Sequence, residues 1–365
     1  MSATDNIHAA NEESANQRVS RALQNRTMSD LKPITPEEAK EQYLEAIRTE
    51  KADSTIQTRE YQLRHFVRWC DKKGIENMNN IDGRDLMNYR KWRRDDGDLN
   101  NVTLRSQMSN IRHFVDFCGR IDAVPPNLHE KVLLPSLDKY ENQRDESLDA
   151  ERAHVMLEFL EKFEYASRDH VVFLILWKTG MRTGGLRALD RDDCYPRKKG
   201  LEVGHHPETD TPLKNKEAGE RMVALDEDEC EVLEDYLEHK RKDVTDDFGR
   251  EPLIKTMNGR MGKVTIRRTA YRLTRPCIYS EVCPHNKNPE DCEARQDYDK
   301  ASQCPDAVSA HPIRRGSITH HLDEDVPKTA VSDRMDVSPD VIDAHYDAAS
   351  KEGKMNRRRE YVENI

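Results

Sequence analysis

Hydrophobic residues recur every three or four positions through the first third of the chain, which is the spacing of amphipathic helices. The first helix should begin after Thr35, because a proline follows it and Glu38 completes the signature of a capping box. Gly74 should end the second helix, since glycine readily takes the left-handed conformation that closes helices. Together these signals predict a four-helix domain over residues 34–124. Its helices are expected at about 35–49, 54–73, 82–94 and 101–118.

The segments on either side of this domain lack such a pattern. Residues 1–33 are polar with little periodicity, which is typical of a flexible tail. Pro125 and Pro126 open a stretch that becomes rich in charge toward its end. We interpret residues 125–146 as a linker.

A second domain is expected over residues 147–365, and its periodicity is mixed. The run 171–177 is apolar throughout and predicts a buried helix over 169–178. The residues at 201–203 and 221–225 have a β pattern and predict a hairpin. The remaining segments predict helices at about 183–189, 226–242, 262–274, 311–324, 327–335 and 338–350. The expected fold class is mainly α with a small β-sheet.

The net charge and the distribution of basic residues give opposite indications about a nucleic-acid partner. The 365 residues carry a net charge of −10, which taken alone argues against a nucleic-acid partner, because DNA affinity depends on cations that displace counterions. The 59 lysines and arginines nevertheless form groups in both domains, and a basic surface on an acidic body is compatible with DNA binding. These groups include Arg90–Arg94, Arg105, Arg112, Arg260, Lys263, Arg267 and Arg268.

The sequence shows no pattern of a membrane-spanning segment or a secretory signal peptide. No apolar run reaches the length that spans a bilayer, and the first residues lack a basic start followed by an apolar core. We expect a cytoplasmic protein with no membrane partner.

Three stretches far apart in the chain carry residues that can act together on a phosphodiester. Arg182 follows the turn 179–181, where a glycine lets the chain reverse and places the arginine on a rigid support. His311 and Arg314 are three positions apart on an expected helix and share a face. Arginine binds two phosphate oxygens at once, and histidine exchanges protons near neutral pH. Tyr346 adds a phenol that neighbouring arginines would help to ionise.

Each of these residues also has a plainer interpretation. Arg182 can pair with a carboxylate such as Asp192 or Asp193, since structural ion pairs often imitate active sites. The His–x–x–Arg pattern occurs by chance in many proteins, and Tyr346 has the spacing of a core residue in a C-terminal helix.

The order of these residues resembles that of the tyrosine recombinase (phage integrase) family, from about residue 35 to the end of the chain. The resemblance implies an N-terminal helical core-binding (SAM-like) domain and a C-terminal mixed α/β catalytic domain that close around double-stranded DNA. It implies a site-specific recombinase that cuts and rejoins DNA through a 3′-phosphotyrosyl intermediate and needs no cofactor. It also implies a homotetramer on paired DNA sites.

The resemblance assigns a role to each residue. Arg182 and Arg314 would hold the scissile phosphate, His311 would assist proton transfer, and Tyr346 would attack phosphorus. A lysine of the hairpin would protonate the departing oxygen. We favour Lys214 for this role, with Lys216 as the alternative.

Three positions depart from the family pattern. Gly185 stands where the family often has an acidic residue, Arg315 where it often has a second histidine, and Val337 where it usually has a histidine or tryptophan. These departures keep a catalytically inactive DNA-binding regulator of the same fold as the main alternative. Two further alternatives are a zinc-stabilised scaffold that binds protein and a type IB topoisomerase.

Half of the eight cysteines lie close together in an insert before the His–x–x–Arg helix. Cys277, Cys283, Cys292 and Cys304 supply the donor set of a tetrahedral zinc site, with His285 as a spare ligand. Their spacing lacks the paired Cys–x–x–Cys of common zinc folds, so free thiols in a polar insert are the alternative. The sequence therefore indicates a possible structural zinc.

Overall fold

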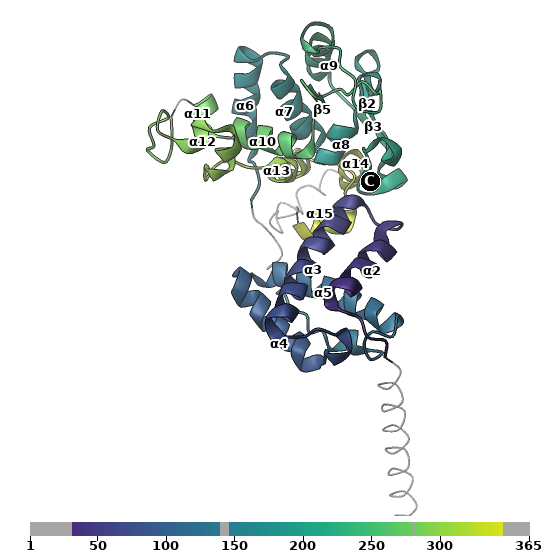
Figure 1. Cartoon of the computed structure of the whole chain (residues 1–365). Helices are drawn as coiled ribbons and strands as arrows, with labels where there is room; N and C mark the ends of the chain where they lie inside the picture. Colours follow the sequence, from purple (N-terminus) through teal and green to yellow (C-terminus); the bar gives the residue numbers. More distant parts are fainter. Residues whose placement is uncertain (1–30, 139–145, 281, 346–365) are drawn as a thin grey trace, which may run out of the picture. The chain divides into compact units, whose positions relative to one another are not determined.

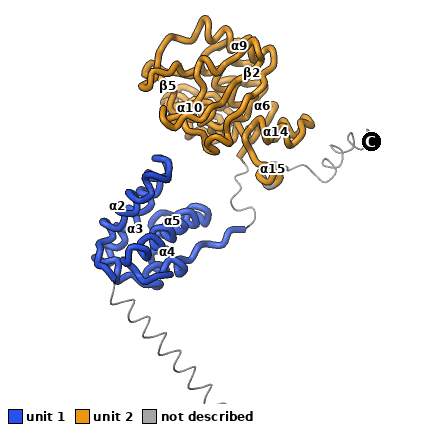
Figure 2. The backbone as a smooth tube through the Cα atoms, turned by 90° about the vertical axis from the view of Figure 1, so that its right-hand side faces the viewer, with its two compact units in different colours: residues 1–144 blue, residues 145–365 orange. Residues whose placement is uncertain are grey.

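The structure of the chain is a computed structural model, and it describes residues 31–138, 146–280 and 282–345. The chain divides into two compact units, 1–144 and 145–365 (Figure 1, Figure 2). Within the described part of the chain, no helix combines the length and the apolar character that crossing a membrane requires. Tyr346 and the residues after it lie outside the described residues.

Unit 1 contains the predicted helices, which pack around an aromatic core. Thr35 and Glu38 form the expected capping box at the start of the first helix. Gly74 closes the second helix with a φ of 67°. The rings of Tyr43, Phe66, Trp69, Tyr89 and Phe114 contact one another in the core. The helices are α2 (Pro36–Arg48), α3 (Asp53–Lys73), α4 (Gly83–Gly97) and α5 (Asn101–Arg120), with short 3-10 turns at Met78–Asn80 and Leu128–Lys131.

The segment after α5 continues to pack on unit 1. Leu128 and Val132 are buried in its core. Arg112 donates a hydrogen bond to the carbonyl of Val132, and Arg105 donates one to the carbonyl of Pro135. These two arginines, which the sequence suggested for DNA contact, therefore attach the following segment to α5.

Unit 2 surrounds the apolar helix that the sequence predicted as buried. That helix, α7 (Arg168–Thr179), carries a continuous run of buried side chains from Asp169 to Trp177. The expected hairpin is the antiparallel pair of β2 (Gly200–Val203) and β3 (Arg221–Ala224), and β1 (Cys194–Tyr195) extends it to three strands in the order β1-β2-β3. A two-stranded sheet of β4 (Lys255–Thr256) and β5 (Gly259–Arg260) was not predicted.

Two short helices, Pro276–Tyr279 and Glu293–Gln296, were not predicted, and the predicted helices occur in the expected order among the other helices of unit 2. The full set beside α7 is α6 (Ala150–Phe163), α8 (Thr183–Ala188), α9 (Glu227–Asp235), α10 (Lys263–Leu273), α11 (Pro276–Tyr279), α12 (Glu293–Gln296), α13 (Ala310–Asp323), α14 (Lys328–Met335) and α15 (Pro339–His345). A π-helical turn, Tyr236–Lys240, continues α9, and 3-10 turns occupy Arg191–Asp193, Pro196–Lys198, Pro207–Thr209, Lys216–Gly219 and Tyr298–Gln303.

Helix α13 lies directly against α7 and the start of unit 2. Ser317 donates a hydrogen bond to the carbonyl of Trp177, and the amide of Leu148 donates one to the carbonyl of Pro312 over 3.1 Å. Gly316 makes this approach possible. A β-carbon there would overlap the carbonyl oxygen of Leu148 and lie 2.8 Å from its carbonyl carbon.

Gly316→Ala should therefore destabilise unit 2 by about 1–3 kcal/mol, because backbone atoms on both sides must move to accept one methyl group. Urea denaturation measures the effect. Gly262→Ser is the matched control in the same unit, since a β-carbon at Gly262 meets no atom within 4 Å. An unchanged midpoint for Gly316→Ala would contradict the close packing of α13 on Leu148.

Candidate active site

Arg182 follows a turn in which Gly180 takes the left-handed conformation that glycine favours. Gly180 follows α7 with a φ of 56°, and a β-carbon there would lie 2.6 Å from the sulfur of Met335. Arg182 is then the N-cap of α8, so its backbone is fixed between two helices. The turn predicted from the sequence thus places this side chain on a rigid support.

The partner of Arg182 is a carboxylate that the sequence analysis did not identify. The guanidinium pairs with Asp336, which follows α14 in a left-handed conformation with a φ of 51°. The other carboxylate oxygen of Asp336 accepts a hydrogen bond from Asn215 over 2.6 Å. Asp192 and Asp193, the partners suggested from the sequence, do not pair with Arg182 in the described structure. An acidic group therefore occupies a cationic site in the free protein.

Arg314 is almost fully buried, and it joins two segments that are distant in the chain. One guanidinium nitrogen donates to the carbonyls of Gly180 and Met335, each over 2.6 Å. The other donates to the carbonyl of Asp336 over 3.3 Å. Arg182 and Arg314 consequently meet at Asp336, one through its carboxylate and the other through its backbone. The structure brings the two predicted arginines together.

His311 lies at the exposed start of α13, three residues before Arg314. Its pKa lies below the ordinary value of 6.5, first because surrounding protein displaces water from part of the imidazole. Nearby positive charges lower the pKa further, and they belong to Arg314, Arg315, Lys214 and Arg182. The imidazole is therefore neutral near pH 7 and able to accept a proton.

The loop between β2 and β3 completes this group of charges. Lys214 contributes to the positive field at His311, and the neighbouring Asn215 holds Asp336. Lys216 begins a 3-10 turn with a φ of 53°, and both lysine side chains are exposed. The electrostatic contact with His311 involves Lys214 and favours it over Lys216.

Two arginines that the sequence analysis did not single out fix the end of α14. Arg334 donates to the carbonyls of Ala224 and Lys178, over 2.6 and 3.0 Å. Arg221, on β3, donates to the carbonyl of Arg334 over 2.8 Å. Asp336 is thereby held in place from the sheet and from α7. No spacing in the sequence connects these positions, because the contacts join segments more than 100 residues apart.

The departures from the family pattern have structural counterparts. Val337 is buried with Ile318, Leu322 and Val331 in a small core beneath α14, so it offers no polar group. Gly185 is buried, and a β-carbon there would contact the side chains of Met181 and Val203 at 3.6 and 3.7 Å, which are apolar surroundings that disfavour an unpaired acid. Asp336 supplies a carboxylate to Arg182 from elsewhere in the chain.

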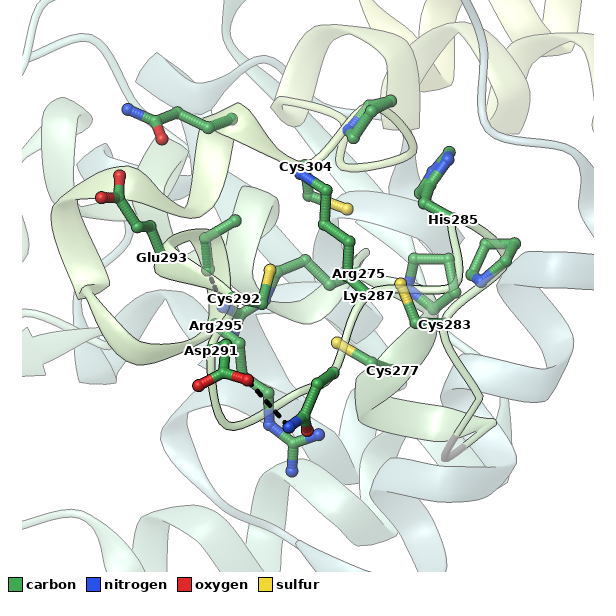
Figure 3. A pocket seen from close by; sticks show the side chains of 16 residues that line it. Arg275, Cys277, Cys283, His285, Lys287, Asp291, Cys292, Glu293, Arg295 and Cys304 are labelled. Atoms are coloured by element: carbon green, nitrogen blue, oxygen red, sulfur yellow. Dashed lines mark hydrogen bonds between the residues drawn. The ribbon is translucent and has the colours of Figure 1, made fainter.

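The four clustered cysteines line one cavity of about 400 Å³ in the insert between α10 and α13. Figure 3 shows the sulfur atoms of Cys277, Cys283, Cys292 and Cys304 gathered around the same space. His285 also lines the cavity, and its imidazole bonds to Asp306 over 2.8 Å. Among the described residues, no group of three or more His, Cys, Asp and Glu side chains is already arranged to hold a metal ion.

One arginine of the second domain has a role other than the DNA contact suggested from the sequence. The side chain of Arg260 is 5% exposed and pairs with Asp190 and Asp246. It also donates to the carbonyl of Arg187 over 2.8 Å. A guanidinium buried in this way organises the small sheet and cannot reach a DNA backbone.

Known proteins share the fold of this chain and the sequence pattern of its first unit. Residues 41–120 match the family model of the phage integrase N-terminal SAM-like domain. The Tn1549 transposon integrase in complex with a circular intermediate DNA is 15% identical, with a TM-score of 0.62, over 90% of this chain and 99% of that chain. Lambda integrase bound to DNA is 11% identical, with a TM-score of 0.55, over 90% of this chain and 98% of that chain.

The N-terminal domain of a phage integrase/site-specific recombinase from Haloarcula marismortui is 34% identical over 28% of this chain and 99% of that chain, with a TM-score of 0.28. No curated protein matches the chain. The helical first unit and the α-rich second unit with its small sheet have the fold of DNA integrases. Residues 41–120 thus match the SAM-like domain of phage integrases, and the chain as a whole has the fold of tyrosine recombinases.

The different surroundings of the two arginines predict different effects on stability. Arg314→Ala should lower the free energy of unfolding by about 1–3 kcal/mol, because buried carbonyls lose their donor. Arg182→Ala should change it by about 1 kcal/mol or less, since it removes one partly exposed ion pair. Urea denaturation followed by circular dichroism measures both variants. Equal effects would contradict the structural role of Arg314.

Proposed function

We propose that the protein is a site-specific DNA recombinase that cuts and rejoins double-stranded DNA through a 3′-phosphotyrosyl intermediate. The observation that carries this proposal is the convergence of Arg182, Arg314, His311 and Lys214 from three separate segments on the surroundings of Asp336. Such a set of cations can bind a phosphate diester and stabilise the charge that develops on it during displacement. The DNA-bound integrases of the same fold support the choice of DNA as the partner.

Each group has a task in the proposed reaction. The scissile phosphate binds to Arg182, and the buried guanidinium of Arg314 adds its positive charge beside Asp336. The hydroxyl of Tyr346 attacks phosphorus. The phosphorus–tyrosine bond forms as the bond to the 5′ oxygen breaks, and Lys214 gives that oxygen its proton. Neutral His311 accepts the proton of the phenol. Attack of a 5′ hydroxyl on the phosphotyrosine reverses the step and rejoins the strand.

Binding of the phosphate requires a change at Asp336. Its carboxylate already neutralises Arg182, and two anions at one guanidinium repel each other. The DNA phosphate therefore replaces this carboxylate, at least at the oxygen that faces Arg182. Asn215 offers the carboxylate an alternative partner during the exchange, because it already binds the second oxygen.

We also propose that the working form is a homotetramer on two paired DNA sites, since exchange of strands between duplexes needs four cleavages. Catalysis requires no cofactor in this scheme, because the energy of each broken bond is kept in the phosphotyrosine. The alternative, a DNA-binding regulator without cleavage activity, is favoured by the buried Val337, which provides no donor to a phosphate oxygen.

A covalent adduct distinguishes the recombinase from the regulator. Duplexes from DNA flanking the gene, nicked so that the cut fragment diffuses away, should accumulate a protein–DNA complex that survives denaturing electrophoresis. Tyr346→Phe should abolish the adduct, because the nucleophile is lost. Tyr361→Phe is the matched control and should retain it. Sequence-specific binding without any adduct would establish the regulator.

The lysine assignment has a test in the same assay. Lys214→Ala should reduce adduct formation by about 10²-fold or more, the usual contribution of a general acid, and Lys216→Ala should have a much smaller effect. A substrate whose departing oxygen is replaced by sulfur needs no proton and should restore the rate of Lys214→Ala. Rescue of Lys216→Ala instead would reassign the role.

Asp336→Asn tests the exchange of anions at Arg182. The amide cannot compete as an anion, so the variant should bind duplex DNA with about fivefold lower Kd, equivalent to about 1 kcal/mol. Asp333→Asn, an exposed position on α14, is the matched control for net charge. Fluorescence anisotropy with labelled duplex measures both. An unchanged or higher Kd for Asp336→Asn relative to this control would show that the carboxylate does not compete with DNA.

A further inference from the structure

The insert between α10 and α13 has almost no hydrophobic core. Between Cys277 and Cys304, the buried apolar side chains of the described residues are those of Ala294 and Ala301. Neither belongs to a hydrophobic cluster of unit 2. Ordering a backbone costs about 1–2 kcal/mol per residue, and two alanines bury too little surface to offset this over such a length. The insert needs another source of order.

Hydrogen bonds from unit 2 secure the two ends of the insert. Its middle has polar ties, a hydrogen bond from Arg275 to the carbonyl of Ala294 and an ion pair between Arg268 and Asp299. Arg152 on α6 donates to the hydroxyl of Tyr279 over 2.6 Å and to the carbonyl of Asp306 over 2.5 Å. The amide of Val308 donates to the hydroxyl of Thr274 over 2.8 Å. These contacts bring the ends of the insert together at the start of α13.

The four cysteines of the insert differ from the other four of the chain. Cys70, Cys118, Cys194 and Cys230 are buried in the two units. Those of the insert are partly exposed and face one cavity from four separate segments (Figure 3). These are α11, the loop after it, the start of α12 and the end of the 3-10 turn Tyr298–Gln303. Four soft donors around one space, in a segment without a core, form the donor set of a structural zinc site.

We propose that Cys277, Cys283, Cys292 and Cys304 bind one Zn²⁺ tetrahedrally and so hold the insert together. The cavity must contract for this, because zinc–sulfur bonds are about 2.3 Å long and the thiols of the described structure are not yet arranged to hold a metal ion. Arg275, Lys287 and Arg295 line the same cavity, and their charges oppose the net negative charge of zinc with four thiolates. Four thiolates already complete a tetrahedral site, so His285, whose imidazole bonds to Asp306, is not needed as a ligand.

The site would stabilise the helix that carries His311 and Arg314. Cys304 lies six residues before the start of α13, and Asp306 and Val308 between them are tied to α6 and α10. Four protein ligands leave zinc no open position, so the metal takes no part in the reaction on DNA. Its presence is independent of the proposed recombinase activity.

Metal analysis of the purified full-length protein tests the proposal. The protein should contain one zinc ion per chain, and the variants Cys283→Ser and Cys292→Ser should each lack zinc. The matched control is Cys230→Ala, which removes a thiol outside the insert and should retain zinc. Substitution with Co²⁺ should give the visible bands of a tetrahedral site and a thiolate charge-transfer band. His285→Ala should leave the zinc content and these bands unchanged.

Native alkylation gives a second measurement on the unmodified sequence, in case the serine variants fail to fold. The four cysteines of the insert should resist iodoacetamide, as should the four buried cysteines. A chelator should make the insert cysteines reactive and lower the Tm of the protein. Freely reactive thiols without bound metal would overturn the proposal. Disulfides among these cysteines in protein kept under reducing conditions would also overturn it. None of these measurements involves DNA, so failure of the recombinase proposal would leave the result intact.

Discussion

The guanidinium of Arg314 is the contact on which the arrangement of the candidate site depends. It donates to carbonyls at the turn after α7 and at the end of α14, and so joins segments more than 130 residues apart. Because the side chain is buried, each carbonyl it satisfies would otherwise lack a partner. The same residue that the family resemblance assigns to phosphate binding is therefore a structural element of unit 2. Its position determines where Arg182 and Asp336 meet.

Electrostatic balance explains why an acidic residue lies among these cations. Partial burial lowers the pKa of the His311 imidazole, and the positive charges of Arg314, Arg315, Lys214 and Arg182 lower it further. Without a counter-ion, such a group of charges would destabilise the free protein. Asp336 provides the counter-ion on a turn held by Arg334 and Asn215. Arg182 is thus paired in the free protein, and in the proposed reaction the DNA phosphate replaces this anion.

The insert before α13 must stay ordered without an apolar core. It has helices of only four residues, and hydrogen bonds fix its ends while its middle has no apolar core. Four cysteine side chains line the centre of the insert, the place that hydrophobic side chains occupy in a larger domain. A bound metal at this place would stabilise the start of the helix that carries two of the candidate active-site residues.

Periodicity and local signals in the sequence predicted the longer helices of both units, the hairpin of β2 and β3 and the turn at Gly180, but not the short helices α11 and α12. Caps, glycines and apolar spacing act between near neighbours, which is why they can be recognised in the sequence. The family resemblance selected His311 and Arg314. Asp336 as the partner of Arg182, the structural use of Arg105 and Arg260, and the fixing of α14 by Arg221 were not evident from it. These contacts join residues far apart in the chain, and a charge or a donor finds its partner only when packing brings the segments together.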